Sequence, residues 1–142
     1  MTNSLSIDNL TLQLINKEHL YAPKADAKGL TQIAVSQTII HATDTLRLIS
    51  TLMDSEKNVQ VKNLYMICEV AYENLVNEFS DASLALAEGD YRSVLFYVGK
   101  CDRFVTDCRD VIGKKRAPQL RDQNSQNRVL VQMSLFSGEL IV

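Results

Sequence analysis

The chain has 142 residues and a formal net charge of −2, which fits one domain and gives no field that would attract nucleic acid or an acidic membrane. Hydrophobic residues make up 46% of it, with only 5 Gly and 2 Pro, and this favours long helices. The apolar runs are short or interrupted by charge, so we expect no membrane span, and the N-terminus lacks the basic and apolar regions of a signal peptide.

Residues 1–24 are the least regular part of the sequence. Their apolar residues fit either a short helix or an extended clasp against the bundle: Leu10, Leu12, Leu14 and Ile15. Pro23 ends this stretch, because the residue before proline avoids the helical region. Asp26 then predicts the start of a long helix, as its cap or as a first-turn acid. One seam of this helix is apolar, in steps of four and three: Val35, Ile39, Ala42, Leu46, Ile49 and Met53.

The stretch 61–112 predicts two antiparallel helices joined by a tight turn at 88–90. The first helix has an apolar face: Val61, Leu64, Cys68, Ala71, Leu75, Phe79, Ala82 and Leu86. The second has a heptad seam: Val94, Val98, Cys101, Val105, Cys108 and Ile112. In the turn, Gly89 can adopt the left-handed conformation that ends a helix, and Asp90 can cap the next one.

This hairpin constrains the pairing of the three cysteines. Counted from the turn, Cys68 and Cys108 come within about 5 Å along the helix axis, whereas Cys101 falls about 15 Å short of Cys68. A disulfide needs Cα atoms about 4.4–6.8 Å apart, so only the Cys68–Cys108 pair fits. Three reduced cysteines in the core remain the alternative, since a free cysteine behaves as a small hydrophobe.

The hairpin is predicted to end at Gly113, followed by a basic run whose cations suit the negative end of a helix. That chemistry explains the run better than a phosphate-binding or nuclear-import patch does. Pro118 is expected to prevent the helix from restarting, and residues 119–126 to form a polar connection. A last helix is predicted from about Asn124 to Leu140. Its apolar stripe is Val129, Met133, Phe136 and Leu140.

Four amphipathic helices, each with one apolar stripe, predict an all-α fold. The economical arrangement is an antiparallel up-down-up-down four-helix bundle with a short N-terminal appendage. The predicted division is an N-terminal extension at residues 1–24 and the bundle at 25–142.

The sequence offers little chemistry. His19 and His41 lie in different predicted elements without a carboxylate or cysteine at ligand spacing, and no Glu-x-x-His pair occurs, so we expect no metal and no cofactor. Neither a Gly-rich phosphate loop nor a nucleophile elbow is present. The acid pairs, Asp107 with Asp110 and Glu88 with Asp90, fit solvated faces and helix caps. These observations favour a binding protein over an enzyme.

Five segments carry a more specific pattern. They are Asp26 with Leu30 and Ile33, Cys68 with Tyr72 in a Cys-x-x-x-Tyr spacing, Ala85-Leu86 followed by Gly89-Asp90-Tyr91, Cys108 with Asp110, and Val129–Leu135. In this order they resemble the plant invertase and pectin methylesterase inhibitor family, over about residues 20–140. The resemblance implies a four-helix bundle with the Cys68–Cys108 disulfide, preceded by a helical hairpin with its own disulfide. It also implies a secreted cell-wall protein of a plant that docks on a carbohydrate-active enzyme and covers its substrate cleft.

The sequence departs from the family pattern at two places. The cysteine pair of the N-terminal hairpin is absent, and residues 1–20 are too short to hold that hairpin in full. At the turn, invertase inhibitors tend to carry Pro-Lys-Phe, whereas Tyr91-Arg92-Ser93 stands here, which is closer to the pectin methylesterase inhibitors. Asp107 and Arg109 replace the expected Thr and Glu around Cys108. Cys101 has no counterpart in the family and is predicted to be a free thiol on the core seam.

The resulting hypothesis is a protein inhibitor of pectin methylesterase that docks through the exposed sides of its long helices. The contact residues predicted from helical phase and turn position are Thr31, Gln37, Thr38, Asn74, Glu78, Asp81, Tyr91, Arg92, Asp102 and Asp110. For each of them an ordinary solvated or packing role is the alternative. Three other hypotheses remain: an inhibitor of acid invertase, a family member without an enzyme target, such as an interaction or storage protein, and an unrelated intracellular bundle with reduced thiols.

Overall fold

The computed structural model describes residues 23–113 and 116–142. Its helices are α2 (Pro23–Ser55), α3 (Val59–Ala87), α4 (Tyr91–Gly99), α5 (Asp102–Ile112) and α6 (Pro118–Glu139). The all-α prediction is therefore confirmed. Within these ranges, every helix is too short or too polar to serve as a membrane span.

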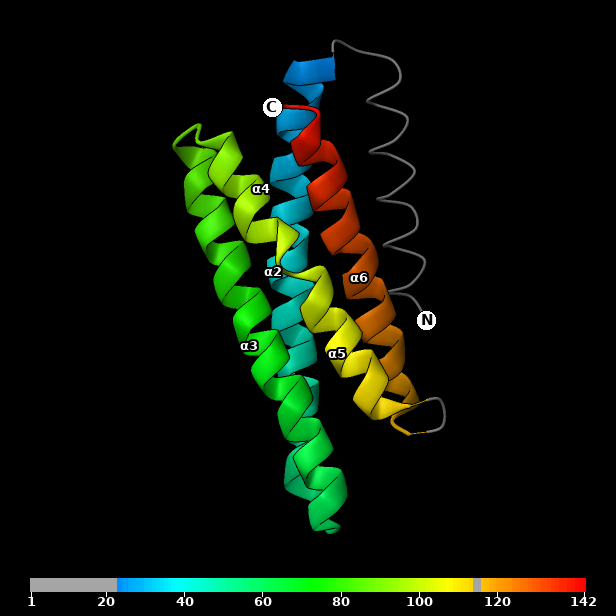
Figure 1. Cartoon of the computed structure of the whole chain (residues 1–142). Helices are drawn as coiled ribbons and strands as arrows, with labels where there is room; N and C mark the ends of the chain where they lie inside the picture. The colour runs from blue at the N-terminus through cyan, green and yellow to red at the C-terminus, as the bar shows by residue number, and fades with distance from the viewer. Residues whose placement is uncertain (1–22, 114–115) are drawn as a thin grey trace.

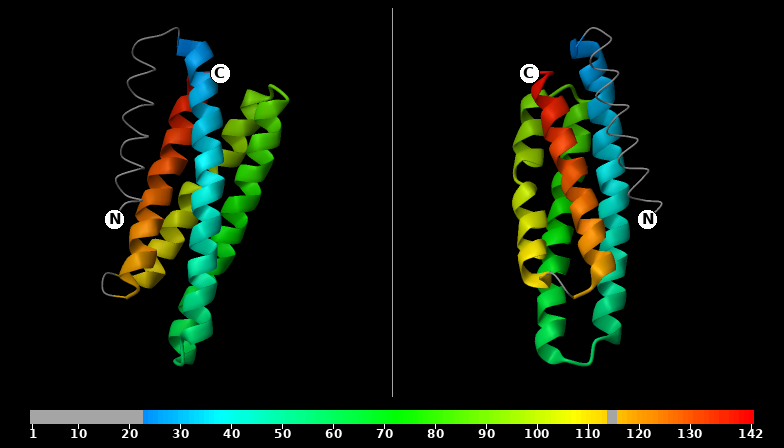
Figure 2. Two further views of the ribbon diagram at one scale, coloured as in Figure 1. Left: turned by 180° about the vertical axis from the view of Figure 1, so that it is seen from behind. Right: turned by 90° about the vertical axis from the view of Figure 1, so that its right-hand side faces the viewer.

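The helices form four rods that run alternately up and down, with α4 and α5 in line as one rod (Figures 1 and 2). Helix α2 packs against α3 and α6. The α4–α5 rod packs against the same two helices, which closes the ring. The predicted four-helix bundle is confirmed. The predicted appendage, residues 1–24, lies outside the described part except for its last two residues, which begin α2.

The connections follow the local chemistry of the sequence. The Asn58 side chain accepts hydrogen bonds from the backbone N–H groups of Gln60 and Val61 and so caps α3. At the next turn Gly89 has φ +77°, a left-handed conformation that glycine adopts without strain. The Asp90 carboxylate accepts a hydrogen bond from the Ser93 backbone N–H at 3.3 Å and caps α4. The predicted turn is confirmed in both parts.

The second arm of the hairpin differs from the prediction. It was expected to be one helix up to Ile112, but it breaks between Gly99 and Asp102. Glycine has little helix propensity, and the backbone tightens here into hydrogen bonds three residues apart, from Lys100 N–H to Tyr97 C=O and from Cys101 N–H to Val98 C=O. The predicted seam nevertheless survives the break, because all six of its residues are buried: Val94, Val98, Cys101, Val105, Cys108 and Ile112.

A disulfide joins the two arms in the core. Cys68 of α3 is bonded to Cys108 of α5, with their Cα atoms 4.6 Å apart, and Cys101 is buried and free. The predicted pairing and the predicted free thiol are confirmed. The alternative of three reduced cysteines is not what the structure contains.

Helix α6 departs most from the sequence prediction. It begins at Pro118, and not near Asn124, since proline fits the first turn of a helix, where its missing N–H has no intrahelical partner. Half of the residues on its buried face are polar. Asn124, Asn127, Ser134 and Ser137 lie there beside Leu120, Leu130, Val131 and Gly138. The predicted apolar stripe lies outside this face, with Val129, Met133 and Leu140 half-buried and Phe136 52% exposed.

Candidate docking surface

A layer of buried polar side chains crosses the bundle and explains the polar inner face of α6. Asn124 donates from Nδ2 to the Val105 carbonyl of α5 at 2.8 Å and accepts at Oδ1 from the Tyr72 hydroxyl of α3 at 2.6 Å. Asn127 donates from Nδ2 to the Tyr72 hydroxyl at 3.1 Å and to the Thr45 hydroxyl of α2 at 2.8 Å. The layer thus links all four rods.

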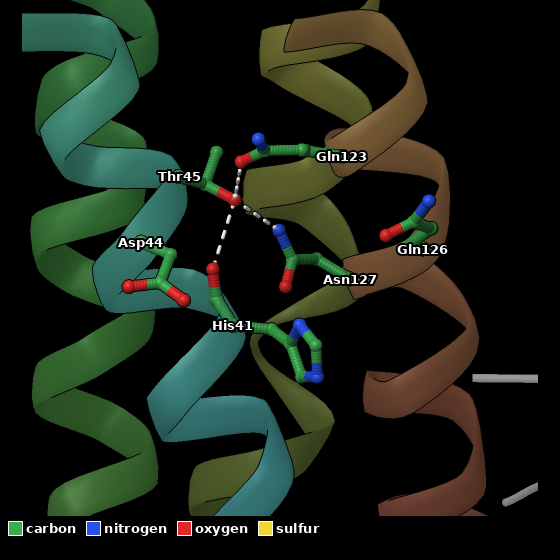
Figure 3. Close-up of a pocket in the computed structure, with 6 residues that line it drawn as sticks. All are labelled: His41, Asp44, Thr45, Gln123, Gln126 and Asn127. Atoms are coloured by element: carbon green, nitrogen blue, oxygen red, sulfur yellow. Dashed lines mark hydrogen bonds between the residues drawn. The ribbon is translucent and has the colours of Figure 1, made fainter. Parts of the chain in front are cut away.

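Where the polar layer reaches the surface, the cavity beside it is too small for a ligand. Figure 3 shows the site between α2 and α6, where Thr45 hydrogen-bonds Gln123 and His41 lies beside Asn127. The cavity there has a volume of about 20 Å³, which is the space of a single water molecule. Among residues 23–113 and 116–142, no three His, Cys, Asp or Glu side chains are grouped as metal ligands would be. The layer is therefore suited to holding helices in register and not to binding a substrate.

Two buried titratable groups in the core are held neutral. Burial raises the pKa of the Cys101 thiol to about 12 from an ordinary 9.0, with a smaller contribution from the Glu78 carboxylate. Burial also raises the pKa of the Tyr72 phenol, against a smaller opposing effect of its hydrogen bond with Asn127. Neither side chain is a nucleophile at neutral pH, since the thiolate and the phenolate are the reactive forms.

These two groups predict a loss of stability in alkali. In the unfolded chain Cys101 ionises near pH 9.0 and tyrosine near pH 10.0, but in the folded chain both keep their protons to higher pH. The unfolded state then binds fewer protons, so the free energy of unfolding falls as pH rises above about 9, by up to about 1.4 kcal/mol per pH unit for each group.

Urea unfolding between about pH 8 and about pH 11 measures this effect. The Cys101→Ala variant is expected to remove the part of the slope that lies between about pH 9 and about pH 10, below the ordinary pKa of tyrosine. A pH-independent free energy of unfolding across this range would contradict the prediction.

An apolar groove lies on the surface of the bundle, along the border between α3 and α5. We name it the α3–α5 groove and define it by its lining: Asn63, Met66, Ile67, Val70, Ala71 and Asn74 of α3, and Arg103, Phe104 and Asp107 of α5. Its volume is about 640 Å³. Met66, Ile67 and Val70 are 45%, 46% and 52% exposed, so a contiguous apolar strip faces solvent here. Exposed apolar clusters with a polar rim are typical of protein interaction sites.

The rim of this groove carries both charges. Arg103 and Asp107 lie one helical turn apart on α5, with Nε and Oδ2 4.0 Å from each other. Both side chains are largely exposed, so the pair contributes little to stability and is available to a partner. An apolar centre surrounded by amides and a charge pair has the composition of a protein-binding patch.

A second groove, between α5 and α6, is polar. Its volume is about 460 Å³, and its lining includes Arg109, Arg128, Thr106 and Gln132. The arginines already have carboxylates nearby, because Arg128 Nε lies 3.5 Å from Asp102 and Arg109 Nε lies 3.2 Å from Asp110. This groove offers a partner less apolar area than the α3–α5 groove.

The predicted contact residues are spread around the bundle and do not form one site. The prediction is wrong for Thr31 and Thr38, which are 0% exposed and face α6, where their hydroxyls lie 2.9 Å from Ser137 and 3.5 Å from Ser134. Exposed positions are Asn74, Asp81, Arg92 and Asp110, and half-buried positions are Gln37, Glu78, Tyr91 and Asp102. Glu78 is paired with Lys100 at 3.4 Å.

Of the ten, only Asn74 lines the α3–α5 groove. The sequence carried a signal for the rest of the groove. Met66, Ile67 and Val70 are apolar, yet they lie off the predicted inner face of the helix. The inner face of α3 already has an apolar residue at each turn, so further apolar residues outside that face indicate a second surface that binds a partner.

The fold and part of the sequence have counterparts among known proteins. The chain is 26% identical over 102 residues to a pectinesterase inhibitor of Actinidia deliciosa, a match that covers 72% of this chain and 55% of the relative. The chain thus spans about half the length of that relative. Two crystal structures from Arabidopsis have the same fold: a pectin methylesterase inhibitor (TM-score 0.77, 19% identity, 92% of this chain and 86% of that one) and a mutant form of a pectin methylesterase inhibitor (TM-score 0.78, 19% identity, 96% and 95%).

The resemblance to the invertase and pectin methylesterase inhibitor family is confirmed. No family model matches the chain, so this resemblance depends on the sequence match to the Actinidia deliciosa protein and on the shared fold. The proteins it matches are named as inhibitors of an enzyme and not as enzymes. The Cys68–Cys108 bond and the Gly89-Asp90 turn are found where the family resemblance expects them.

Proposed function

We propose that this protein is an inhibitor of pectin methylesterase that binds its target through the α3–α5 groove and covers the substrate cleft. The observation that carries the proposal is the joint match in sequence and fold to proteins named as inhibitors of this enzyme. The Cys68–Cys108 disulfide supports function in an oxidising compartment, and we propose secretion to the plant cell wall.

The physical basis of inhibition is a rigid surface. Side chains on the long helix α3 and on α5, which a disulfide ties to it, lose little conformational freedom on binding. An interface of ordinary size buries about 800 Å² on each partner, and its energy concentrates in a few central apolar or aromatic residues. Ile67, Val70 and Phe104 are the residues of the groove that fit this central role.

Titration of purified pectin methylesterase with the oxidised protein tests the proposal. Loss of esterase activity near a one-to-one ratio is expected. A second candidate, inhibition of acid invertase, follows from the same family, so an acid invertase is titrated beside it. Inhibition of invertase alone would replace the first target by the second. Inhibition of neither enzyme would remove the functional proposal and leave the fold unaffected.

The groove itself makes a sharper prediction. The Val70→Arg variant puts a charge at the apolar centre and is expected to weaken inhibition by about thirtyfold or more, the effect of losing a central contact of about 2 kcal/mol. Inhibition constants of the parent and the variant measure it.

Leu84→Arg is the matched control. Leu84 is 64% exposed on the same helix, but it lies 14 residues further on, about 21 Å away, and does not line the groove. We expect its inhibition constant to stay within about threefold of the parent value. Equal inhibition constants for Val70→Arg and the parent would place the contact surface elsewhere.

A further inference from the structure

The groove between α5 and α6 carries positive charge, although the chain as a whole has a net charge of −2. We name it the α5–α6 groove and define it by Thr106 and Arg109 of α5 and by Ser125, Arg128, Val129 and Gln132 of α6. The described residues that line it include both of these arginines and no aspartate or glutamate. A groove lined by one sign of charge concentrates ligands of the opposite sign, so this groove favours an anionic ligand.

Both arginines keep donors for a ligand. Arg109 donates from Nε to Asp110 at 3.2 Å, and Arg128 Nε lies 3.5 Å from Asp102. A guanidinium has further N–H donors on its terminal nitrogens. Within residues 23–113 and 116–142 these terminal nitrogens form no hydrogen bond in either arginine, and the two side chains are 50% and 43% exposed. Each arginine can therefore hold a carboxylate in the two-pronged geometry that a guanidinium favours.

The two guanidinium groups stand at opposite ends of the groove. Their partners Asp102 and Asp110 are eight positions apart on α5, which is about 12 Å along the helix axis. Thr106 lies midway between these aspartates, and Ser125 of α6 adjoins the Asn124 amide that reaches across to α5 (Figure 1). A single carboxylate does not reach both arginines over this distance. The groove therefore suits a chain that carries acidic groups at intervals, with polar groups between them.

We propose that the α5–α6 groove binds an acidic sugar chain, a run of galacturonic acid units whose carboxylates meet Arg109 and Arg128. Hydrolysis of a methyl ester in pectin leaves such a carboxylate, so the ligand is the product of the esterase that this protein is proposed to inhibit. The identity of the sugar rests on that proposed function, whereas the demand for repeated acidic groups rests on the two arginines and their spacing.

The lining of the groove fits a sugar chain better than an acidic peptide. Thr106, Ser125 and Gln132 supply hydroxyl and amide groups that can pair with the hydroxyls of a sugar. A peptide gains its affinity from main-chain hydrogen bonds to a sheet edge or from apolar anchors in a pocket. The described residues form helices and no strand, and the aliphatic lining consists of Val105, which is buried, and Val129, which is half-buried. A peptide would find few anchors here.

The α5–α6 groove and the α3–α5 groove lie on different flanks of α5. Among the described residues the two grooves have no lining residue in common. A sugar chain in one of them therefore leaves the other free for the esterase. Each methyl group that the enzyme removes adds a carboxylate that the α5–α6 groove binds, so the inhibitor would collect on the stretches of pectin where the enzyme has already acted.

Calorimetric titration with a fully de-esterified oligomer of galacturonic acid tests the proposal without any enzyme. We expect saturable binding to the parent protein. The fully methyl-esterified oligomer, which has the same ring hydroxyls but no charge, is expected not to bind. Arg109→Gln and Arg128→Gln are each expected to weaken binding of the acidic oligomer by about tenfold or more, because each removes a group that forms charge-assisted hydrogen bonds.

Arg92→Gln is the matched control for these variants. Arg92 is exposed on α4 and does not line the groove. It lies ten positions before Asp102, about 15 Å along the α4–α5 rod, which exceeds the screening length of about 10 Å at moderate salt. We expect its affinity for the oligomer to stay within about twofold of the parent value.

A second pair of variants keeps both arginines. Ser125→Glu places a carboxylate inside the groove and is expected to weaken binding by about tenfold or more through repulsion of the acidic chain. Ser50→Glu adds the same charge at an exposed position of α2, outside the groove, and is expected to leave the affinity within about twofold of the parent value. Both serines are exposed, so neither change is expected to disturb the fold.

Other results overturn the proposal. Equal affinities of the parent, Arg109→Gln and Arg128→Gln would place the sugar elsewhere on the protein. A glutamate oligomer that binds as tightly would make the ligand an acidic peptide, and monomeric galacturonic acid that binds as tightly would reduce the site to one for a single anion. Binding of the oligomer without inhibition of the esterase would remove the proposed function alone. Inhibition without binding of the oligomer would remove this inference alone.

Discussion

Replacing Cys68 and Cys108 together by alanine is expected to lower the free energy of unfolding by about 4 kcal/mol. The bond closes a loop with a sequence separation of 40 residues, and the chain-entropy relation gives about 4 kcal/mol for a loop of this length. That amounts to a large fraction of the stability of a domain of this size, about 5–15 kcal/mol. Urea unfolding of the double variant and of the parent, both without reductant, measures the difference.

The position of the bond strengthens this expectation. The bond joins α3 to α5, the half of the α4–α5 rod that lies beyond the break. The tight turn connects α3 directly only to α4, so the bond is the covalent link that fixes α5 against α3. The control is Cys101→Ala, which removes a buried thiol and keeps the bond, and should cost only about 1 kcal/mol. A double variant that unfolds within about 1 kcal/mol of the parent would show that packing alone holds the two arms together.

The sequence was most informative where packing repeats along a helix. The seams of α3 and of the α4–α5 rod were predicted almost residue by residue, because an apolar heptad has one way to face a core. The disulfide followed from the same register, since a tight turn fixes the level of every residue on both arms. The break at Gly99 was missed, because a single glycine within a continuous seam lowers helix propensity without marking an end.

Helix α6 could not be predicted in the same way. Its sequence carries an apolar stripe on one face and asparagines and serines on another, and hydrophobic periodicity favours burial of the stripe. The outcome is the reverse, because Asn124 and Asn127 find partners on α3, α5 and α2, which no local pattern can show. The stripe is then left nearer the surface, where Met133 is half-buried and Phe136 is 52% exposed.

The contact residues predicted from the sequence and the lining of the α3–α5 groove have only Asn74 in common. Helical phase correctly identified exposed positions such as Asn74 and Asp81, but it placed Thr31 and Thr38 outside, because threonine is usually a surface residue. A list of exposed positions also does not show which of several surfaces is suited to binding a partner. The α3–α5 groove became recognisable only when α5 was placed beside Met66, Ile67 and Val70.

The polar layer supplies the second large prediction, which concerns Tyr72. The Tyr72→Phe variant removes only a hydroxyl, but that hydroxyl donates to Asn124 Oδ1 and accepts from Asn127 Nδ2. Both amides are buried, at 4% and 1% exposure, so each loses a hydrogen bond that water cannot replace. A buried polar group without a partner costs about 1–3 kcal/mol, and two of them predict a loss of about 2–4 kcal/mol in the free energy of unfolding.

Tyr97→Phe is the control for this change. Tyr97 is half-buried on α4, and within the described residues its hydroxyl forms no hydrogen bond, so its removal should change the free energy of unfolding by less than about 0.5 kcal/mol. Urea unfolding of both variants at neutral pH provides the comparison.

A double-mutant cycle separates the hydrogen bond from the packing of the ring. If the cost of Tyr72→Phe comes from the orphaned Asn124 oxygen, the same change should cost less in an Asn124→Leu background, where that oxygen no longer exists. We expect the two substitutions to be coupled by about 1 kcal/mol or more. Additive effects would mean that the loss arises from the ring or from Asn127 alone. In that case Asn124 would serve chiefly to satisfy the Val105 carbonyl, and the layer would consist of two independent pairs instead of one network across the four rods.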